Sequence, residues 1–204
     1  MVLFLKKTLR ASEQEREDIT EQRLRWHEFQ TKADPCKLIF LDESGAKTNM
    51  TRLYDRALKG RRCYDKAPVG RWESITMLSS IRLDGEIQSL MFEGAVDRKM
   101  FEAYIEQVLG PSLRPGDIVI MDNLSSHKSR VAQEFVESRS ASYVFLPAYS
   151  PDFNPIEKMW SKIKQILRSL KARAEEELFD AVAKALSMVT AEDTQGWFKS
   201  CGYI

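Results

Sequence analysis

The chain has 204 residues, which suits one domain with an appendage or two small domains and is enough to bury a core without disulfide or metal cross-links. Its 31 basic and 30 acidic residues leave a formal net charge of +1, and 43% of the residues are hydrophobic, as in soluble globular proteins. No apolar run approaches the roughly 18 residues of a membrane helix. Three scattered cysteines and two distant histidines argue against a disulfide framework and a zinc site and favour a reducing compartment, so a bound metal would need carboxylate ligands.

The first 35 residues are predicted to form a charged helical appendage. Ser12 is a suitable N-cap, the stretch from Glu13 to about Lys32 is typical of a solvated helix with few apolar anchors, and Asp34-Pro35 ends it. We therefore expect a helical linker over residues 1–35 and a single α/β domain over residues 36–204.

The rest of the chain alternates strand and helix patterns, which predicts an α/β layer with a mixed sheet. Asp84-Gly85 between two strand-like runs is a strong hairpin signal. The expected elements, in chain order, are a strand at Leu38–Leu41, an irregular basic segment over residues 45–70, hairpin strands within residues 72–92, a helix that Asp97 caps and Gly110-Pro111 ends, a strand at Ile118–Met121, a helix from Ser125 or Ser126 to about Glu137, a strand at Tyr143–Leu146, and helices over residues 155–171 and 175–189.

Two of these strands are apolar throughout and each ends in an aspartate, Asp42 and Asp122. Sites in open α/β sheets form beyond the carboxyl ends of the strands, and strands about 4.8 Å apart would let both side chains share one ion. Glu157, at the start of a basic helix, is a third candidate. Carboxylates that converge without a metal raise each other's pKa, whereas Mg²⁺ or Mn²⁺ prefers oxygen ligands, and two such ions can clamp the attacking and leaving oxygens of a phosphodiester.

Each candidate also has a purely structural interpretation. An Asp after a strand is often only a turn residue, and Asn154, Pro155 and Glu157 match the N-cap, N1 and N3 positions of a capping box. His127 could orient a scissile phosphate or a water molecule, or it could be a polar residue in a solvated helical turn. Trp160 lies on the apolar stripe of its helix and is predicted to be a core residue.

Basic residues gather in two places, so the near-neutral net charge does not exclude a polyanionic partner. Between Lys158 and Arg173 there are six basic residues and no acidic one, and Lys164 and Arg168 share a helical face with Glu157. This pattern favours contact with a DNA backbone over an ordinary solvated face. A second candidate patch for the DNA backbone comprises Arg52, Arg56, Lys59, Arg61 and Arg62.

Three segments together resemble a known family. They are Leu41–Ser44 (LDES), Met121–His127 (MDNLSSH) and Tyr149–Trp160 (YSPDFNPIEKMW). They are similar to the catalytic core of mariner-superfamily transposases, specifically the bacterial insertion-sequence branch, and the 34 residues between the second Asp and the Glu match that family's usual spacing. The resemblance extends over about residues 38–186.

The resemblance implies an RNase H-like mixed sheet flanked by helices, with Asp42 and Asp122 on adjacent central strands and Glu157 on a helix. It implies a DDE transposase, in which these three carboxylates bind two Mg²⁺ or Mn²⁺ ions, water attacks a phosphodiester at a transposon end, and the freed 3′-hydroxyl attacks target DNA. Auxiliary residues beside the site would be Asn123, His127 and Asn154.

The same resemblance implies a homodimer on transposon-end and target DNA, and a nucleoid-associated bacterial protein of the cytoplasm, away from membranes. Such enzymes normally carry an N-terminal pair of helix-turn-helix modules, for which the stretch before the first strand is too short. We expect these modules on a separate subunit or in an upstream reading frame, with a truncated copy as the alternative. Two other functions stay open: a catalytically silent DNA-binding or regulatory fragment, and an RNase H-like nuclease with another substrate.

Overall fold

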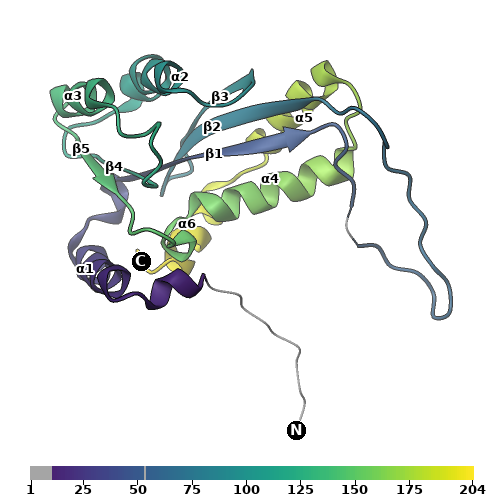
Figure 1. The fold of residues 1–204 in the computed structure, drawn as a ribbon, viewed down its shortest axis with the longest axis horizontal. Coiled ribbons are helices and arrows are strands. Elements are labelled where there is room, and N and C mark those ends of the chain that lie inside the picture. The colour runs from purple at the N-terminus through teal and green to yellow at the C-terminus, as the bar shows by residue number, and fades with distance from the viewer. Residues whose placement is uncertain (1–10, 53) are drawn as a thin grey trace, which may run out of the picture.

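The computed structural model describes residues 11–52 and 54–204, and a five-stranded mixed sheet lies at its centre (Figure 1). The sheet has the order β3-β2-β1-β4-β5, in which β1 pairs in parallel with β4 and antiparallel with β2. The other two pairings are antiparallel for β2 with β3 and parallel for β4 with β5. The strands are β1 (Leu38–Lys47), β2 (Ser74–Arg82), β3 (Ile87–Glu93), β4 (Ile118–Met121) and β5 (Ser142–Phe145).

Strand β1 is longer than its sequence predicts, and the expectation that it ends at Asp42 is wrong. Its parallel pairing with β4 stops at Phe40 and Ile120, but its antiparallel pairing with β2 continues to Lys47. The continuous apolar run marks only the part of the strand that has neighbours on both edges and helices on both faces, and a strand can continue beyond that part. Beyond Phe40, β1 therefore has one open edge toward the end of β4.

The two faces of the sheet are covered by different helices, because successive side chains of a strand point to opposite faces. Leu38 and Phe40 pack in one apolar cluster, and Ile39 and Leu41 pack in the other. The second cluster contains residues of α2 (Arg98–Ala103), of the π-helical turn Tyr104–Leu109 and of α3 (Arg130–Ser138), and the first contains residues of α1 (Glu17–Lys32), α4 (Ile156–Leu170), α5 (Glu175–Ser187) and α6 (Ala191–Ser200).

The hairpin between β2 and β3 is confirmed, and its turn shows why a glycine stands there. Gly85 has a φ of +91°, which side chains disfavour, and a Cβ at this position would approach the Cα of Ala191 to 3.0 Å. Replacement of the glycine would therefore strain the turn and push it away from α6.

Two helical predictions are wrong in detail, and one helix was not predicted. Ser129 caps α3, not Ser125 or Ser126, because residues 123–128 form a turn that carries His127 into the interior. A short 3₁₀ turn at Gly110–Ser112 continues the helical path where an end was expected. The helix α6 was not predicted from its sequence. Only two of its apolar side chains, Trp197 and Phe198, pack inward, and the polar residues and Gly196 around them give no clear apolar stripe.

Helix α1 does not form a solvated appendage on all its sides. Ile19, Trp26 and Gln30 are buried, and Trp26 belongs to the same apolar cluster as Phe40. Its indole Nε1 donates a hydrogen bond of 2.9 Å to the hydroxyl of Tyr203 at the other end of the chain. The division at residue 35 stays a prediction, and no helix in the described part of the chain is long and apolar enough to cross a membrane.

Replacement of Trp26 by Ala should lower the free energy of unfolding by about 3–5 kcal/mol, because it removes a buried ring and leaves the Tyr203 hydroxyl without its donor. Urea unfolding at pH 7 would measure this loss. Trp72 is about half exposed and serves as the matched control, for which Trp72→Ala should change stability by less than about 0.5 kcal/mol. Equal losses for the two variants would show that α1 is not part of the folded core.

Candidate active site

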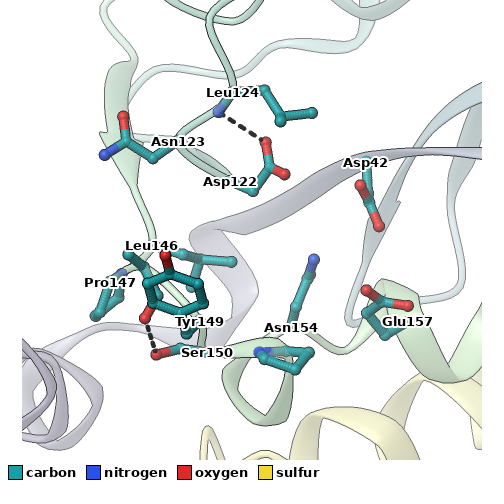
Figure 2. A pocket seen from close by; sticks show the side chains of 12 residues that line it. Asp42, Asp122, Asn123, Leu124, Leu146, Pro147, Tyr149, Ser150, Asn154 and Glu157 are labelled. Carbon is teal, nitrogen blue, oxygen red and sulfur yellow. Dashed lines mark hydrogen bonds between the residues drawn. The ribbon is translucent and has the colours of Figure 1, made fainter. Parts of the chain in front are cut away.

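The candidate site lies where the parallel part of the sheet ends. Continuation of the β1–β4 register past Phe40 and Ile120 places Asp42 opposite Asp122. Both side chains line a cavity of about 500 Å³, and Glu157 from the first turn of α4 lines it as well (Figure 2). Its remaining wall comes from the ends of β4 and β5 and from the loop that follows β5.

Asp42 is the buried member of this set, with 9% of its surface exposed. Its carboxylate accepts hydrogen bonds from the backbone N–H of Glu43 at 2.8 Å and from the indole Nε1 of Trp160 at 3.2 Å. Figure 2 shows this carboxylate pointing toward Glu157. Burial, followed by the negative charge of Glu157, raises the pKa of Asp42 to about 7, although the Glu43 hydrogen bond opposes the change.

Asp122 lies across the cavity from this pair (Figure 2). Its Oδ1 accepts a hydrogen bond from the backbone N–H of Leu124 at 3.2 Å and lies 2.8 Å from Nδ1 of His127. Within residues 11–52 and 54–204, no three Asp, Glu, His or Cys side chains converge closely enough to form a ready-made metal site. The structure thus brings Asp42 and Glu157 face to face and places Asp122 on the opposite wall.

His127 is completely buried, so its interpretation as a residue of a solvated helical turn is wrong. Its Nε2 lies 2.9 Å from Oε2 of Glu43, and its Nδ1 lies 2.8 Å from Oδ1 of Asp122. The ring also packs against Phe101, with 4.6 Å between centroids. Burial alone would lower the pKa of His127, but the contacts with Asp122 and Glu43 outweigh it and raise the pKa to about 9.

Asn154 does not cap α4, which corrects the capping-box interpretation of Asn154, Pro155 and Glu157. The N-cap of the helix is Pro155, and the cap makes no side-chain hydrogen bond. The Asn154 side chain is 4% exposed, and its nitrogen points into the cavity (Figure 2). Its buried Oδ1 has no hydrogen-bond partner among the described residues. Asn123 lines the same cavity from the exposed end of β4.

Two residues of the site were missed by sequence reasoning. Glu43 follows Asp42 in β1, so it points to the opposite face of the sheet, where it meets His127. Trp160 is a core residue, as predicted, but its N–H also reaches Asp42. Two sequence signals could have identified them. Alternation along the strand places Glu43 on the opposite face from Asp42, and the three-residue step from Glu157 places Trp160 beside it on α4.

The predicted basic residues lie in two neighbouring parts of the structure. The loop between β1 and β2 projects from the body of the molecule (Figure 1) and carries the five residues of the second predicted patch, all of them exposed. Its Arg52 lines a second cavity of about 650 Å³ together with Arg168 of α4. The residues on this loop are Arg52, Arg56, Lys59, Arg61 and Arg62.

Three of the six basic residues between Lys158 and Arg173 are already used within the chain. Lys162 pairs with Asp193, Lys171 lies 2.7 Å from Asp65, and Arg173 donates to backbone carbonyls of the β1–β2 loop. Lys164 and Arg168 make no ion pair within the described residues and are half-buried. Together with the exposed Lys158, these two are the cations of α4 that make no ion pair within the described residues.

Sequence comparison relates this chain to transposases. A family model described as "DDE superfamily endonuclease" matches residues 37–179. The chain is 27% identical over 92 residues to the Transposable element Tcb2 transposase of Caenorhabditis briggsae, and 26% identical over 106 residues to the Tcb1 transposase of the same organism. These alignments cover 43% and 48% of this chain but only 34% and 39% of the two relatives.

Solved structures share the fold at low sequence identity. The Mos1 transposase in its paired-end complex with the left transposon end has a TM-score of 0.79 at 16% identity, over 99% of this chain and 64% of that one. The catalytic domain of Mos1 mariner transposase has a TM-score of 0.65 at 12% identity, over 98% and 93%. Mos1 paired-end complexes solved with Mn and with Mg give TM-scores of 0.74 and 0.73. These likenesses confirm the predicted RNase H-like mixed sheet flanked by helices.

Replacement of Asp42 by Asn should stabilise the metal-free protein at pH 8. A carboxyl whose pKa rises from 3.8 to about 7 on folding favours the folded state only while it is protonated, so stability falls between about pH 4 and pH 7, by up to roughly 4 kcal/mol. Asn carries no charge and escapes this loss. Urea unfolding in a chelator should therefore show a gain at pH 8 that shrinks toward pH 5.

The exposed Asp180 offers the control, for which Asp180→Asn should show no such pH-dependent gain. An Asp42→Asn variant that is no more stable than the parent at pH 8 would mean that the ionised carboxylate is not strained by burial.

Proposed function

Because the chain belongs to the DDE superfamily endonucleases and is related to the Tc1/mariner transposases, we propose that it is the catalytic domain of a DNA transposase, a metal-dependent endonuclease and strand transferase at transposon ends. One observation carries this proposal: the three acidic residues of the transposase-like segments, distant in sequence, line one cavity where the parallel pairing of β1 and β4 ends. A purely structural role would not require a buried, unneutralised Asp42 in that cavity.

The residues present fit a site for hard divalent cations. Asp42, Asp122 and Glu157 supply carboxylate oxygens, which Mg²⁺ and Mn²⁺ prefer, and burial together with the negative charge of Glu157 raises the pKa of Asp42. We propose that these three residues hold two such ions. Bound ions would neutralise this charge and stabilise the attacking and leaving oxygens of a phosphodiester. The Mos1 complexes with Mn and with Mg support the choice of metals.

The chain's own side chains would each contribute a distinct task. Trp160 donates to Asp42 and so fixes the rotamer of that carboxylate. His127 contacts Asp122 through Oδ1, which leaves Oδ2 for a cation. Asn154 presents an unpaired amide to the cavity, where we propose that it hydrogen-bonds the DNA strand or its water, and Asn123 lies at the rim. Because unpaired buried amides are costly, the cavity favours a polar occupant at Asn154.

The proposed substrate is DNA, first the transposon end and then the target. Support comes from the cations of α4 and of the β1–β2 loop that make no ion pair within residues 11–52 and 54–204, and from the Mos1 paired-end complexes, which contain transposon-end DNA. Such contacts would position the backbone without reading its sequence. We propose that end recognition comes from helix-turn-helix modules on a separate subunit or in an upstream reading frame, and that a homodimer acts on the DNA.

The finer assignment within the family is also a proposal. We propose that the chain belongs to the bacterial insertion-sequence branch and acts at the nucleoid in the cytoplasm. The wording of Leu41–Ser44, Met121–His127 and Tyr149–Trp160, with its 34-residue spacing, supports this branch.

Removal of any one carboxylate should abolish cleavage. A plasmid that carries the element's terminal sequences would be incubated with the protein and Mn²⁺, and nicked, linear and joined products would be separated on a gel. Asp42→Asn, Asp122→Asn and Glu157→Gln should each lower the rate by more than about a hundredfold. Even the loss of a residue that only hydrogen-bonds a metal ligand lowers metal affinity or activity by about 10–100-fold. The Asp180→Asn variant should cut like the parent.

The same assay separates the two rival functions. A silent fragment would bind the plasmid without any Mn²⁺-dependent product. A nuclease of another specificity would cut an RNA–DNA hybrid faster than the terminal duplex. Either outcome in the parent protein would overturn the transposase assignment.

Lys164 and Arg168 should account for part of the salt dependence of DNA binding. Each phosphate contact adds about 0.9 to the slope of the logarithm of affinity against the logarithm of salt concentration. Lys164→Gln and Arg168→Gln should each flatten the slope by about that amount, equally for terminal and unrelated duplexes. Fluorescence anisotropy would measure it, with Lys184→Gln on the exposed side of α5 as control. An unchanged slope in both variants would remove α4 from the DNA path.

A further inference from the structure

One side chain of α1 reaches the loop that forms a wall of the active-site cavity. Arg23 Nη1 donates to the hydroxyl of Ser150 at 2.7 Å, and its two terminal nitrogens grip both oxygens of Asp152, at 3.0 and 2.6 Å. The guanidinium also stacks over the ring of Phe153, 4.2 Å from its centroid. A guanidinium binds a carboxylate through two parallel hydrogen bonds, a geometry that a lysine cannot reproduce.

This contact is more than an isolated surface ion pair, which would be worth little. Only 16% of the Arg23 side chain is exposed, although half of Asp152 faces solvent. One turn further along α1, the ring of His27 packs edge-on against Phe153, with 4.9 Å between centroids. Because Phe153 is itself 3% exposed, one face of α1 fixes a residue anchored in the core.

The loop under this grip is strained where it faces the cavity. Tyr149 has a φ of +56°, an unfavourable conformation for a residue with a side chain. Its carbonyl accepts a hydrogen bond of 2.5 Å from Gln14, which lies just before α1. Tyr149, Ser150 and Pro151 all line the cavity. The N-terminal segment therefore holds in place a backbone that would not adopt this conformation by itself.

The held loop leads directly into the catalytic helix. The 3₁₀ turn Pro151–Phe153 precedes Asn154, and the backbone N–H of Glu157 donates to the Asn154 carbonyl at 3.3 Å. A shift of this turn would therefore move Asn154 and Glu157 relative to Asp42. Figure 1 shows α1 beside the segment that connects β5 with α4.

We propose that Arg23 is a positioning residue of the active site, which holds the segment 149–153 and thereby sets the placement of Asn154 and Glu157. This inference rests on the proposed function for its catalytic consequence, but its structural part does not depend on it. The N-terminal helix is then a component of the catalytic machinery and not merely a linker to other modules.

The test compares Arg23→Ala and Arg23→Lys with Arg25→Ala. Arg25 is an exposed arginine on the same helix that pairs only with Glu21 among the described residues, so it controls for the loss of charge and of helix propensity. Hydrogen–deuterium exchange, followed by mass spectrometry, would report on peptides that span residues 147–157. Exchange in these peptides should be faster in Arg23→Ala, less so in Arg23→Lys, and unchanged in Arg25→Ala.

Mn²⁺-dependent cleavage of the terminal plasmid supplies the second readout. Misplacement of reacting groups by an ångström can cost about a hundredfold, so kcat of Arg23→Ala should fall ten- to about a hundredfold while KM for DNA stays within about twofold. Arg23→Lys should recover part of kcat. Urea unfolding of each variant shows whether the folded fraction is intact.

The outcomes separate the two claims. If the parent does not cleave, the proposed function fails, and the exchange data still decide whether Arg23 holds the loop. If the parent cleaves and Arg23→Ala matches Arg25→Ala in exchange and in kcat, the positioning role is overturned. A fall in kcat that only follows a fall in the folded fraction, or a rise in KM with kcat unchanged, would overturn it as well.

Discussion

The structure depends on a carboxylate that is buried without a countercharge. Asp42 lies within the central strand β1, receives two hydrogen bonds, faces Glu157 and has a pKa raised to about 7. A protein that needed only a folded core would place an apolar residue there, as it does at Leu41. The proposed function explains why the protein bears the cost of burying this carboxylate. A bound metal ion would supply the positive charge that Asp42 lacks.

The location of the site follows from the way β1 changes partners. Up to Phe40 the strand is paired on both edges, and beyond it only the hairpin side remains paired. The edge that opens there gives access to Asp42 from the end of β4, where Asp122 stands. Because β1 continues past Phe40 and stays paired with β2, the backbone of Asp42 is held in the sheet. Its side chain is therefore buried and can still be reached from the open edge.

Local pattern predicted most of the sheet, because apolar runs, Asp84-Gly85 and strand-end aspartates are signals carried by adjacent residues. The motif segments also pointed to Asp42, Asp122 and Glu157, which the structure places around one cavity. Contacts between distant segments carry no such local signal. The meeting of Glu43 with His127, of Trp160 with Asp42 and of Arg23 with Asp152 depends on how the helices dock, and α6 has too few apolar residues to stand out. The inward direction of Asn154 was hidden because its sequence context equally suits a helix cap.

The projecting segment between β1 and β2 has a further consequence for how such chains can diverge. Its two ends are joined by the Lys47–Ser74 pair of the hairpin ladder, at the far end of β1 from the sheet's parallel half. Lengthening a loop whose ends are already joined costs little conformational entropy, about 0.6 kcal/mol of free energy for each doubling of the loop length. Insertions and deletions here would leave the spacing of the acidic residues in space untouched. The length and charge of the β1–β2 loop can therefore change during evolution while the arrangement of Asp42, Asp122 and Glu157 stays the same.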